Sequence, residues 1–201
     1  MIDDVEAIAK IIEEEFDYGV LTHVSNDGIA KFETTRLDGS KSSALFSTDG
    51  RHRYVLTRMF PAHVRGSGNV VTFIMLNPST ATHDVDDPTI TRCIRFAQRW
   101  GFTAMQVVNL MAFRSTNPKT LHDIPDAEGG VYNTYAILRA SRDAKIVVCA
   151  WGEHGADRSE TILPVLRKYV GDKLRCLARN ASGQPKHPLY VPATTLPIEF
   201  P

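Results

Sequence analysis

From residue 69 onward, four apolar stretches rich in β-branched residues predict buried strands. They are residues 69–76 (NVVTFIML), 105–110 (MQVVNL), 145–151 (KIVVCAW) and 173–178 (KLRCLA). Between them, apolar residues at helical spacing predict helices at about 88–100, 131–141 and 156–169. Alternating strands and helices are typical of a mostly parallel sheet with helices on both faces. We therefore expect an α/β protein, a three-layer α/β/α sandwich around a central sheet of about four strands.

The chain before this region has a different pattern. Residues 2–16 place apolar side chains along one stripe and predict a short amphipathic helix. Between residues 19 and 60, short β-like stretches are interrupted by NDG, LDGS and TDG, which are typical of hairpin turns. The sequence contains no repeat, low-complexity segment or linker. We predict a single domain over 1–201, in which 1–50 form a helix and hairpin extension and 51–201 form the α/β core.

A loop of small polar and acidic side chains follows the first predicted core strand, and a helix with clear boundary signals follows the loop. Asp87 is a suitable N-cap, Pro88 suits the first turn, and Gly101 follows the last turn. The helical spacing leaves Arg92 facing solvent or a ligand. For Asp87 taken alone, capping is favoured over catalysis.

Composition narrows the possible classes of protein. The chain is 43% hydrophobic and 23% charged, as is usual for a globular protein, and no apolar run approaches the roughly 18–20 residues of a membrane span. The acidic N-terminus lacks the basic character of a signal peptide, so we expect a cytoplasmic protein without membrane contact. Three widely spaced cysteines form no CxxC pair or Cys/His cluster, so reduced thiols are expected.

The formal net charge is zero but unevenly distributed. Residues 1–17 contain seven acids and one lysine, which leaves 22 basic against 16 acidic residues in the rest of the chain. A polyanionic partner is compatible with this excess, although a solvated surface explains any single basic cluster equally well.

Polar groups follow all four predicted core strands. The first strand ends in Asn77, the second in Asn109 and the third in Trp151-Gly152, and the fourth leads into a loop that contains His187. Because ligands of open α/β sheets bind outside the carboxyl ends of the strands, we expect these groups to line one site. A carboxamide at a buried strand end, such as Asn77, can orient a water molecule or bind a polar ligand edge.

Structural explanations compete with functional ones at several positions. A buried amide without a partner costs about 1–3 kcal/mol, so Asn109 should have a specific partner, which is either backbone or substrate. Gly152 either serves a tight turn or lets a ligand approach the main chain. His154 alone is weak evidence for a site. His187 suits an acid, a donor or an oxyanion stabiliser, although a lone loop histidine is more often structural.

Several common enzyme signatures are absent. The sequence contains no GxGxxG, GxxxxGK[ST], HExxH or GxSxG, which argues against dinucleotide enzymes, P-loop NTPases, zincins and serine hydrolases. Asp84, Asp86 and Asp87 offer oxygen ligands for Mg²⁺, but this run beside a capped helix is a weak metal signal. We therefore predict neither a metal nor an organic cofactor.

Several motifs resemble known families. The stretches FIMLNPSTA, DDPTITRC, FAQRWGF, VVNLMAFRST, AWG and GQPKHPLY, spread over residues 53–192, closely resemble a bacterial and phage family catalogued as a domain of unknown function (unknown-function family 1643). More distantly, the order of motifs resembles the uracil-DNA glycosylase superfamily, in which NPG or DPY follows the first core strand and HPS lies in a late loop. Here NPS at 77–79 and HPL at 187–189 occupy those places.

The glycosylase resemblance implies specific roles. Asn77 would position the water that attacks the sugar, His187 would donate to the departing base, and Asn109 would read the base edge. The candidate catalytic residues are Asn77, Asp87 and His187. The candidate substrate-binding residues are Pro78, Ser79, Thr80, Arg92, Asn109, Phe113, Arg114, Trp151, Gly152, His154, Pro188 and Tyr190.

These observations lead to a prediction of function. We expect an enzyme acting on a nucleobase or nucleotide, most specifically a DNA N-glycosylase-like hydrolase that cleaves the N-glycosidic bond of a pyrimidine, modified or not, with an oriented water. DNA or a nucleotide is the expected partner, and the oligomeric state is left open. Two alternatives remain: a transferase or hydrolase of nucleotide or DNA base modification, and a non-catalytic nucleic-acid-binding or protein-binding module.

Overall fold

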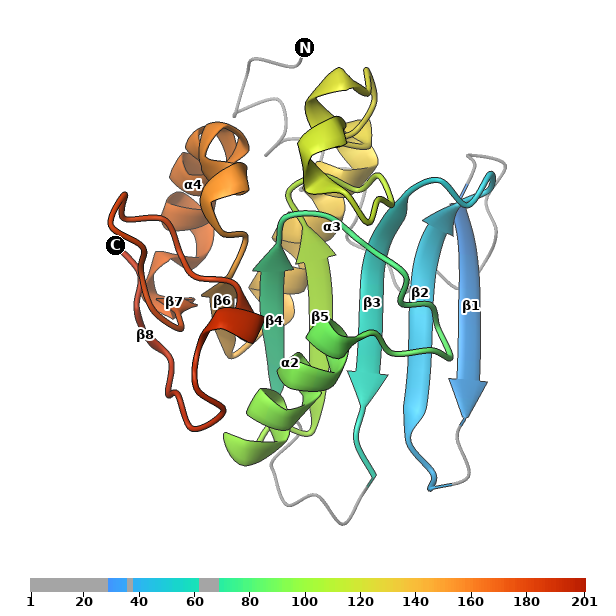
Figure 1. Ribbon diagram of the computed structural model, residues 1–201. Helices are drawn as coiled ribbons and strands as arrows, with labels where there is room; N and C mark the ends of the chain where they lie inside the picture. The colour runs from blue at the N-terminus through green and yellow to red at the C-terminus, as the bar shows by residue number, and fades with distance from the viewer. Residues whose placement is uncertain (1–28, 36–37, 62–68) are drawn as a thin grey trace.

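The computed structural model describes residues 29–35, 38–61 and 69–201. In this part of the chain the protein is a mixed α/β structure, with α-helices packed on one eight-stranded sheet (Figure 1). The helix predicted over 2–16 and the predicted NDG turn lie outside the described residues.

The sheet contains both parallel and antiparallel neighbours. Its strands are β1 (Ile29–Thr35), β2 (Lys41–Ser47), β3 (Arg53–Met59), β4 (Val70–Met75), β5 (Ala104–Asn109), β6 (Ile146–Cys149), β7 (Leu174–Cys176) and β8 (Ile198–Glu199), in the spatial order β1-β2-β3-β5-β4-β6-β7-β8. Strands β5, β4, β6 and β7 are parallel to one another. The neighbours β1–β2, β2–β3, β3–β5 and β7–β8 are antiparallel.

Helical segments connect these strands. The α-helices are α2 (Pro88–Arg99), α3 (Gly130–Asp143) and α4 (Ala156–Val170). The short 3₁₀ helices are η1 (Pro118–Asp123), η2 (Glu153–Gly155), η3 (Gly171–Lys173) and η4 (Pro188–Tyr190). Within the described residues, no helix has the length and apolar character needed to cross a membrane.

The prediction of a parallel core is confirmed, but the prediction of a mostly parallel sheet with about four strands is wrong. The four predicted strands are β4 to β7, and β1, β2, β3 and β8 extend the same sheet on both sides. The predicted extension over 1–50 supplies β1 and β2, and it belongs to the central sheet because β2 pairs with β3, which in turn pairs with β5 through partners such as Leu56 and Val107. This pairing uses backbone groups of β5 that a four-stranded sheet would leave at an exposed edge.

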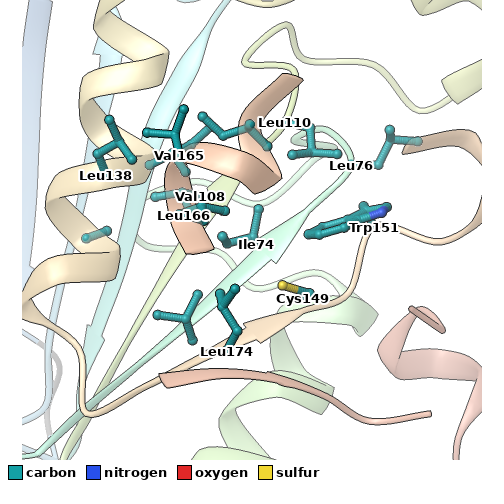
Figure 2. Packing of buried hydrophobic residues seen from close by; sticks show 14 of the residues in the cluster. Ile74, Leu76, Val108, Leu110, Leu138, Cys149, Trp151, Val165, Leu166 and Leu174 are labelled. Atoms are coloured by element: carbon teal, nitrogen blue, oxygen red, sulfur yellow. The ribbon is translucent and has the colours of Figure 1, made fainter. Parts of the chain in front are cut away.

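Helices cover both faces of the parallel strands, and successive residues of β4 contribute to opposite faces. Phe73 belongs to a buried cluster that includes Phe96 of α2. Ile74 belongs to a second buried cluster with Val165 and Leu166 of α4 (Figure 2). Burial on both faces explains why the core strands are continuously apolar in sequence rather than alternating.

Local signals in the sequence correspond to the observed turns and caps. The Asp87 side chain accepts a hydrogen bond of 2.8 Å from the backbone N–H of Ile90, which confirms the predicted N-cap of α2. Residues 38–40 of LDGS lie between β1 and β2, and TDG lies between β2 and β3, as predicted. Gly50 in the second turn has a φ of 70°, a left-handed conformation that favours glycine.

A β-bulge interrupts the pairing of β2 with β3. Leu45 pairs with Val55, but the next residue, Phe46, pairs with Arg53, so Tyr54 is the extra residue of the bulge. Because cross-strand partners point to the same face, Arg53 lies on the face of Phe46, which α2 covers. Tyr54 packs instead in a cluster that contains Ala136 of α3. The bulge thus turns Arg53 toward the α2 side of the sheet.

The three cysteines are buried packing residues. Cys93, Cys149 and Cys176 are free thiols, and burial raises the pKa of each one. A raised pKa keeps a thiol protonated at neutral pH, and a protonated thiol is a poor nucleophile. These cysteines therefore have no part in the site described below.

Candidate functional site

A cavity of about 730 Å³ lies at the carboxyl edge of the parallel strands. Residues at the ends of β4, β5 and β6 line it, together with the first turn of α2 and the loop between β7 and η4. The chain leaves β4 toward α2 on one face and leaves the adjacent β6 toward α4 on the other. The cavity thus lies where the connections diverge, which is the usual ligand position in open α/β sheets.

The structure brings most of the predicted site residues to this cavity. Those that line it are Asn77, Ser79, Asp87, Asn109, Trp151, Gly152, His154, His187 and Tyr190. Thr80, Phe113 and Arg114 line a second hollow of about 590 Å³.

Three predicted residues line neither hollow: Pro78, Arg92 and Pro188. Pro78 and Pro188 are buried, and their positions are structural. The carbonyl of Pro78 accepts two hydrogen bonds, and Pro188 begins η4. Arg92 lies beyond the first turn of α2 and is half-buried there.

The Asn77 side chain is held by two backbone carbonyls. Its Nδ2 donates to the carbonyl of Pro78 at 2.9 Å and to that of Ser115 at 2.8 Å. Both partners are acceptors, so they fix which end of the amide is the nitrogen. No described residue donates to Oδ1. Asn77 lines the cavity, and its oriented amide oxygen can accept a hydrogen bond from water or a ligand.

Asn109 presents an amide without protein partners. The residue is 1% exposed, and neither its Oδ1 nor its Nδ2 has a hydrogen-bond partner among the described residues. Sequence reasoning left two alternatives for this amide, backbone or substrate, and the structure supplies no backbone partner within the described chain. Asn109 lines the cavity, and a carboxamide can donate hydrogen bonds from its nitrogen and accept them at its oxygen.

His187 is poised as a neutral hydrogen-bond donor. Its Nδ1 accepts a hydrogen bond of 3.3 Å from the backbone N–H of Leu189, which caps η4. In the neutral imidazole the proton is then on Nε2, and no described residue binds that nitrogen. Burial lowers the pKa of His187 below its ordinary value of 6.5, and the negative charge of Asp87 opposes this shift. At neutral pH the ring is therefore predominantly uncharged.

Asp87 combines a structural and an electrostatic role. Its Oδ1 is engaged as the α2 N-cap, and the same carboxylate lines the cavity. Its charge acts on both His187 and Arg53, raising the pKa of each against the effect of burial. A fixed negative charge therefore stands beside the imidazole and the buried guanidinium.

The loop that precedes His187 is attached to the end of β6. Trp151 Nε1 donates to Oε1 of Gln184 at 2.8 Å, and the backbone N–H of Gly152 donates to the carbonyl of Pro185 at 3.0 Å. Gly152 has a φ of 75° and a ψ of −171°, a conformation that is essentially restricted to glycine. These contacts fix the position of His187 relative to the strand ends.

Sequence reasoning missed some of the cavity residues, and Arg53 is the most important of them. Arg53 comes from β3 and is 2% exposed. In the sequence it belongs to a basic stretch, 51–65, and nothing distinguishes it from its neighbours. Arg53 reaches the cavity because of the bulge at Tyr54, and no local pattern in the sequence predicts this bulge. Ser115, Thr116, Glu153 and Asn180 also line the cavity, in the segments that follow β5, β6 and β7.

The second hollow adjoins the cavity and is basic. Ser79, Ser115 and Thr116 line both spaces, so the two hollows share three residues with hydroxyl side chains. The guanidinium of Arg51 lies 5.2 Å from the centre of the Phe113 ring, within this hollow. Arg114 also lines the hollow, and its guanidinium lies 5.2 Å from the ring centre of Phe46. Aromatic contacts of this kind hold an arginine in place. Nη1 of Arg114 also donates to the carbonyl of Gly50 at 3.2 Å.

The acidic residues before α2 have protein partners of their own. Asp86 forms a buried ion pair of 2.7 Å with Arg58, and Asp84 accepts a hydrogen bond of 2.6 Å from Thr82. Among the described residues, no group of three or more His, Cys, Asp or Glu side chains is arranged to hold a metal ion.

Comparison with protein families gives a match over more than half of the chain. Residues 53–189 match the model of a family described as "Protein of unknown function (DUF1643)". The matched span covers more than half of the chain and includes the cavity residues from Arg53 to His187. No curated protein matches this chain.

Proposed function

This chain belongs to the DUF1643 family of proteins of unknown function, and from the site itself we propose that it is an enzyme acting on a nucleobase or nucleotide. The specific reaction that we propose is hydrolysis of the N-glycosidic bond of a pyrimidine, modified or unmodified, in DNA. The proposal includes a relation to the three-layer α/β/α fold of the uracil-DNA glycosylases. Helices on both faces of the parallel strands support that relation.

The observation that carries the proposal is the unpartnered amide of Asn109. A buried polar group without a partner is costly, and a bound molecule that pairs with it removes that cost. The Watson–Crick edge of a pyrimidine offers a donor beside an acceptor, which complements a carboxamide. A site of this kind rejects a molecule that lacks the matching groups, because the buried amide is then left unpaired.

The other cavity groups match the charges of N-glycosidic cleavage. The bond between the sugar C1′ and the base nitrogen breaks, its electron pair stays on the base, and the sugar becomes cationic. Nε2–H of His187 donates a hydrogen bond to the base as negative charge develops on the base. The carboxylate of Asp87 stabilises the cationic sugar. Oδ1 of Asn77 accepts a hydrogen bond from the water that attacks C1′. The water oxygen forms the new bond to C1′ and releases a proton to solvent.

Features beside the cavity suit a polymeric substrate. Arg51 and Arg114 in the second hollow can bind backbone phosphates next to the nucleotide in the cavity. Tyr190 lines the cavity, is 79% exposed and lies 5.6 Å from His187 between ring centres. An exposed aromatic ring in that position can stack on a neighbouring base while the target nucleotide is extruded, which costs a few kcal/mol.

A glycosylase assay tests the proposal. Single-stranded and duplex oligonucleotides would each carry one test base, covering uracil, thymine, cytosine and 5-substituted pyrimidines, and abasic sites would be scored by alkaline cleavage. We expect abasic product with the wild-type protein. Asn77→Ala and His187→Ala should each reduce its rate of formation by about 100-fold or more.

His122→Ala is the matched control, because His122 is exposed in η1 and lines neither hollow. It should retain the wild-type rate. Absence of abasic product from every substrate would overturn the proposed reaction. So would equal rates for wild type, Asn77→Ala and His187→Ala.

A further inference from the structure

Two arginines of β3 are equally buried, but they differ in whether a carboxylate pairs with their charge. Arg53 and Arg58 are each 2% exposed. Arg58 has a carboxylate partner, Asp86, at 2.7 Å. Arg53 forms no ion pair with any carboxylate in the described part of the chain, although the charge of Asp87 is near enough to raise its pKa. Arg53 is therefore a buried cation that lacks a bound counter-ion.

The hydrogen bonding of Arg53 is also incomplete. Its Nη1 donates to the carbonyl of Ala81 at 2.9 Å, and its Nε is buried without a partner in the described chain. A guanidinium has five N–H donors, so most of its donor capacity is unused by the protein. Burial lowers the pKa of Arg53 to about 9, and the group remains protonated at neutral pH. A charged group in this state has a large desolvation cost that a ligand can offset.

The fold directs this side chain into the cavity. The extra residue of the bulge, Tyr54, packs toward α3, and Arg53 is turned to the α2 side, where it lines the same cavity as Asn109. Bulges commonly re-aim side chains next to active sites. Arg53 thus lines the space in which the proposed substrate binds.

We propose that Arg53 binds an anionic oxygen group, a carboxylate or a phosphate, on the molecule that occupies the cavity. This inference rests on the proposed function in one respect, which is that the ligand contains a pyrimidine. The planar fork of a guanidinium matches two oxygens of a carboxylate or phosphate. Such a group supplies both the missing counter-ion and acceptors for the unused N–H donors. The preferred substrate is then a pyrimidine with an acidic ring substituent or a nucleotide whose phosphate reaches Arg53.

Binding measurements with two matched pairs of ligands test the inference and identify the anion. Uracil and 5-carboxyuracil differ by a ring carboxylate, and deoxyuridine and its 5′-monophosphate differ by a phosphate. Titration calorimetry on the full chain should show, in one pair, at least about tenfold tighter binding of the anionic member. In Arg53→Gln this preference should fall to twofold or less, while the affinity for the neutral member stays within about threefold of wild type.

Arg95→Gln is the control for net charge, because Arg95 is an exposed residue of α2 that lines neither hollow. It should keep the wild-type preference. If Arg53→Gln does not fold, as judged by circular dichroism, Arg53→Lys replaces it, because lysine keeps the charge and loses the fork. In that variant a preference reduced at least threefold supports the inference, and an unchanged preference overturns it.

Three outcomes overturn the inference: equal affinity of wild type for both members of both pairs, a preference that survives in Arg53→Gln, and no binding of either anionic probe. The experiment needs no turnover, so it separates this inference from the proposed reaction. Formation of abasic product without an anion preference would overturn only the inference. An Arg53-dependent anion preference without abasic product on any substrate would overturn only the proposed reaction.

Discussion

The side-chain amide of Asn77 donates to the carbonyl of Ser115 across 2.8 Å and thereby joins the loop after β4 to the loop after β5. A second bond from the same nitrogen reaches the carbonyl of Pro78 at 2.9 Å, and the backbone N–H of Ser115 donates to that carbonyl as well. The three groups form a small closed network. The network that orients the amide oxygen toward its proposed water also holds the two strand ends together.

Substitutions at Asn77 should therefore affect stability as well as activity. Asn77→Ala leaves the Ser115 carbonyl without this donor and the Pro78 carbonyl with one donor instead of two, and it should lower the free energy of unfolding by about 1–3 kcal/mol. Asn77→Asp should cost more, because a carboxylate oxygen then faces both carbonyls. Urea denaturation measures both values. An aspartate variant as stable as wild type would show that these two hydrogen bonds are unimportant.

The ionisation of His187 should determine the acidic limb of the pH profile. Burial lowers its pKa below 6.5, and protonation below that pKa places a hydrogen on Nδ1, which then no longer accepts the hydrogen bond from the Leu189 N–H that holds the ring. We expect kcat/KM to rise with pH through this pKa and then to level off near neutral pH. Asp87→Asn removes the charge that opposes the shift, so it should move the limb to still lower pH.

The same shift links His187 to stability. Below pH 6.5 the unfolded chain binds a proton at this histidine more readily than the folded protein does, so stability should fall on acidification through the folded pKa. His187→Asn should show a weaker dependence over this range in denaturation experiments at several pH values. A wild-type acidic limb centred above pH 6.5 would contradict the assignment of this group.

A pair of glycine substitutions tests the support beneath the cavity. A Cβ on Gly155 would lie 2.5–2.8 Å from side-chain atoms of Trp151, whose indole holds the loop before His187. Gly155→Ala should therefore cost about 1–3 kcal/mol of stability and weaken ligand binding. Gly171→Ala meets nothing within 4 Å and should be close to neutral. Equal thermal unfolding temperatures for the two variants would exclude the steric argument.

The ion pair between Arg58 and Asp86 should be structural rather than functional. Their side chains are 3% and 16% exposed, so removal of one partner leaves a largely buried charge. Asp86→Ala should lower the free energy of unfolding by about 3–5 kcal/mol. Asp84→Ala, in which the lost carboxylate is 52% exposed, should have a much smaller effect. An Asp86→Ala variant as stable as wild type would contradict this assignment.

The parts of the fold that were predictable are those that the sequence encodes locally. The apolar runs of β4 to β7 and the cap at Asp87 depend on neighbouring residues, and both were found from sequence. Pairing of β3 with β5 depends on contacts between distant segments, and β3 contains two buried arginines, Arg53 and Arg58, which obscure its apolar pattern. Strand β8 is two residues long and too short to produce a pattern.

The residues of the candidate site also divide into those that local sequence predicts and those that depend on pairing between distant segments. Strand ends share an edge of the sheet in any parallel arrangement, which is why Asn77, Asn109 and His187 could be expected together. Arg53 reaches the cavity from an antiparallel strand through a bulge. The location of a bulge depends on the pairing of β2 with β3, which no single stretch of sequence specifies.

The bulge at Tyr54 also suggests how this family can diversify. Because the face to which Arg53 points depends on one additional residue in β3, a single-residue deletion at that point would reverse its direction without altering any amino acid that lines the cavity. Relatives with a shorter segment here would lack this buried guanidinium in the cavity and would select different molecules. Length variation in this hairpin, rather than substitution within the pocket, is then the feature to compare when family members are sorted by ligand.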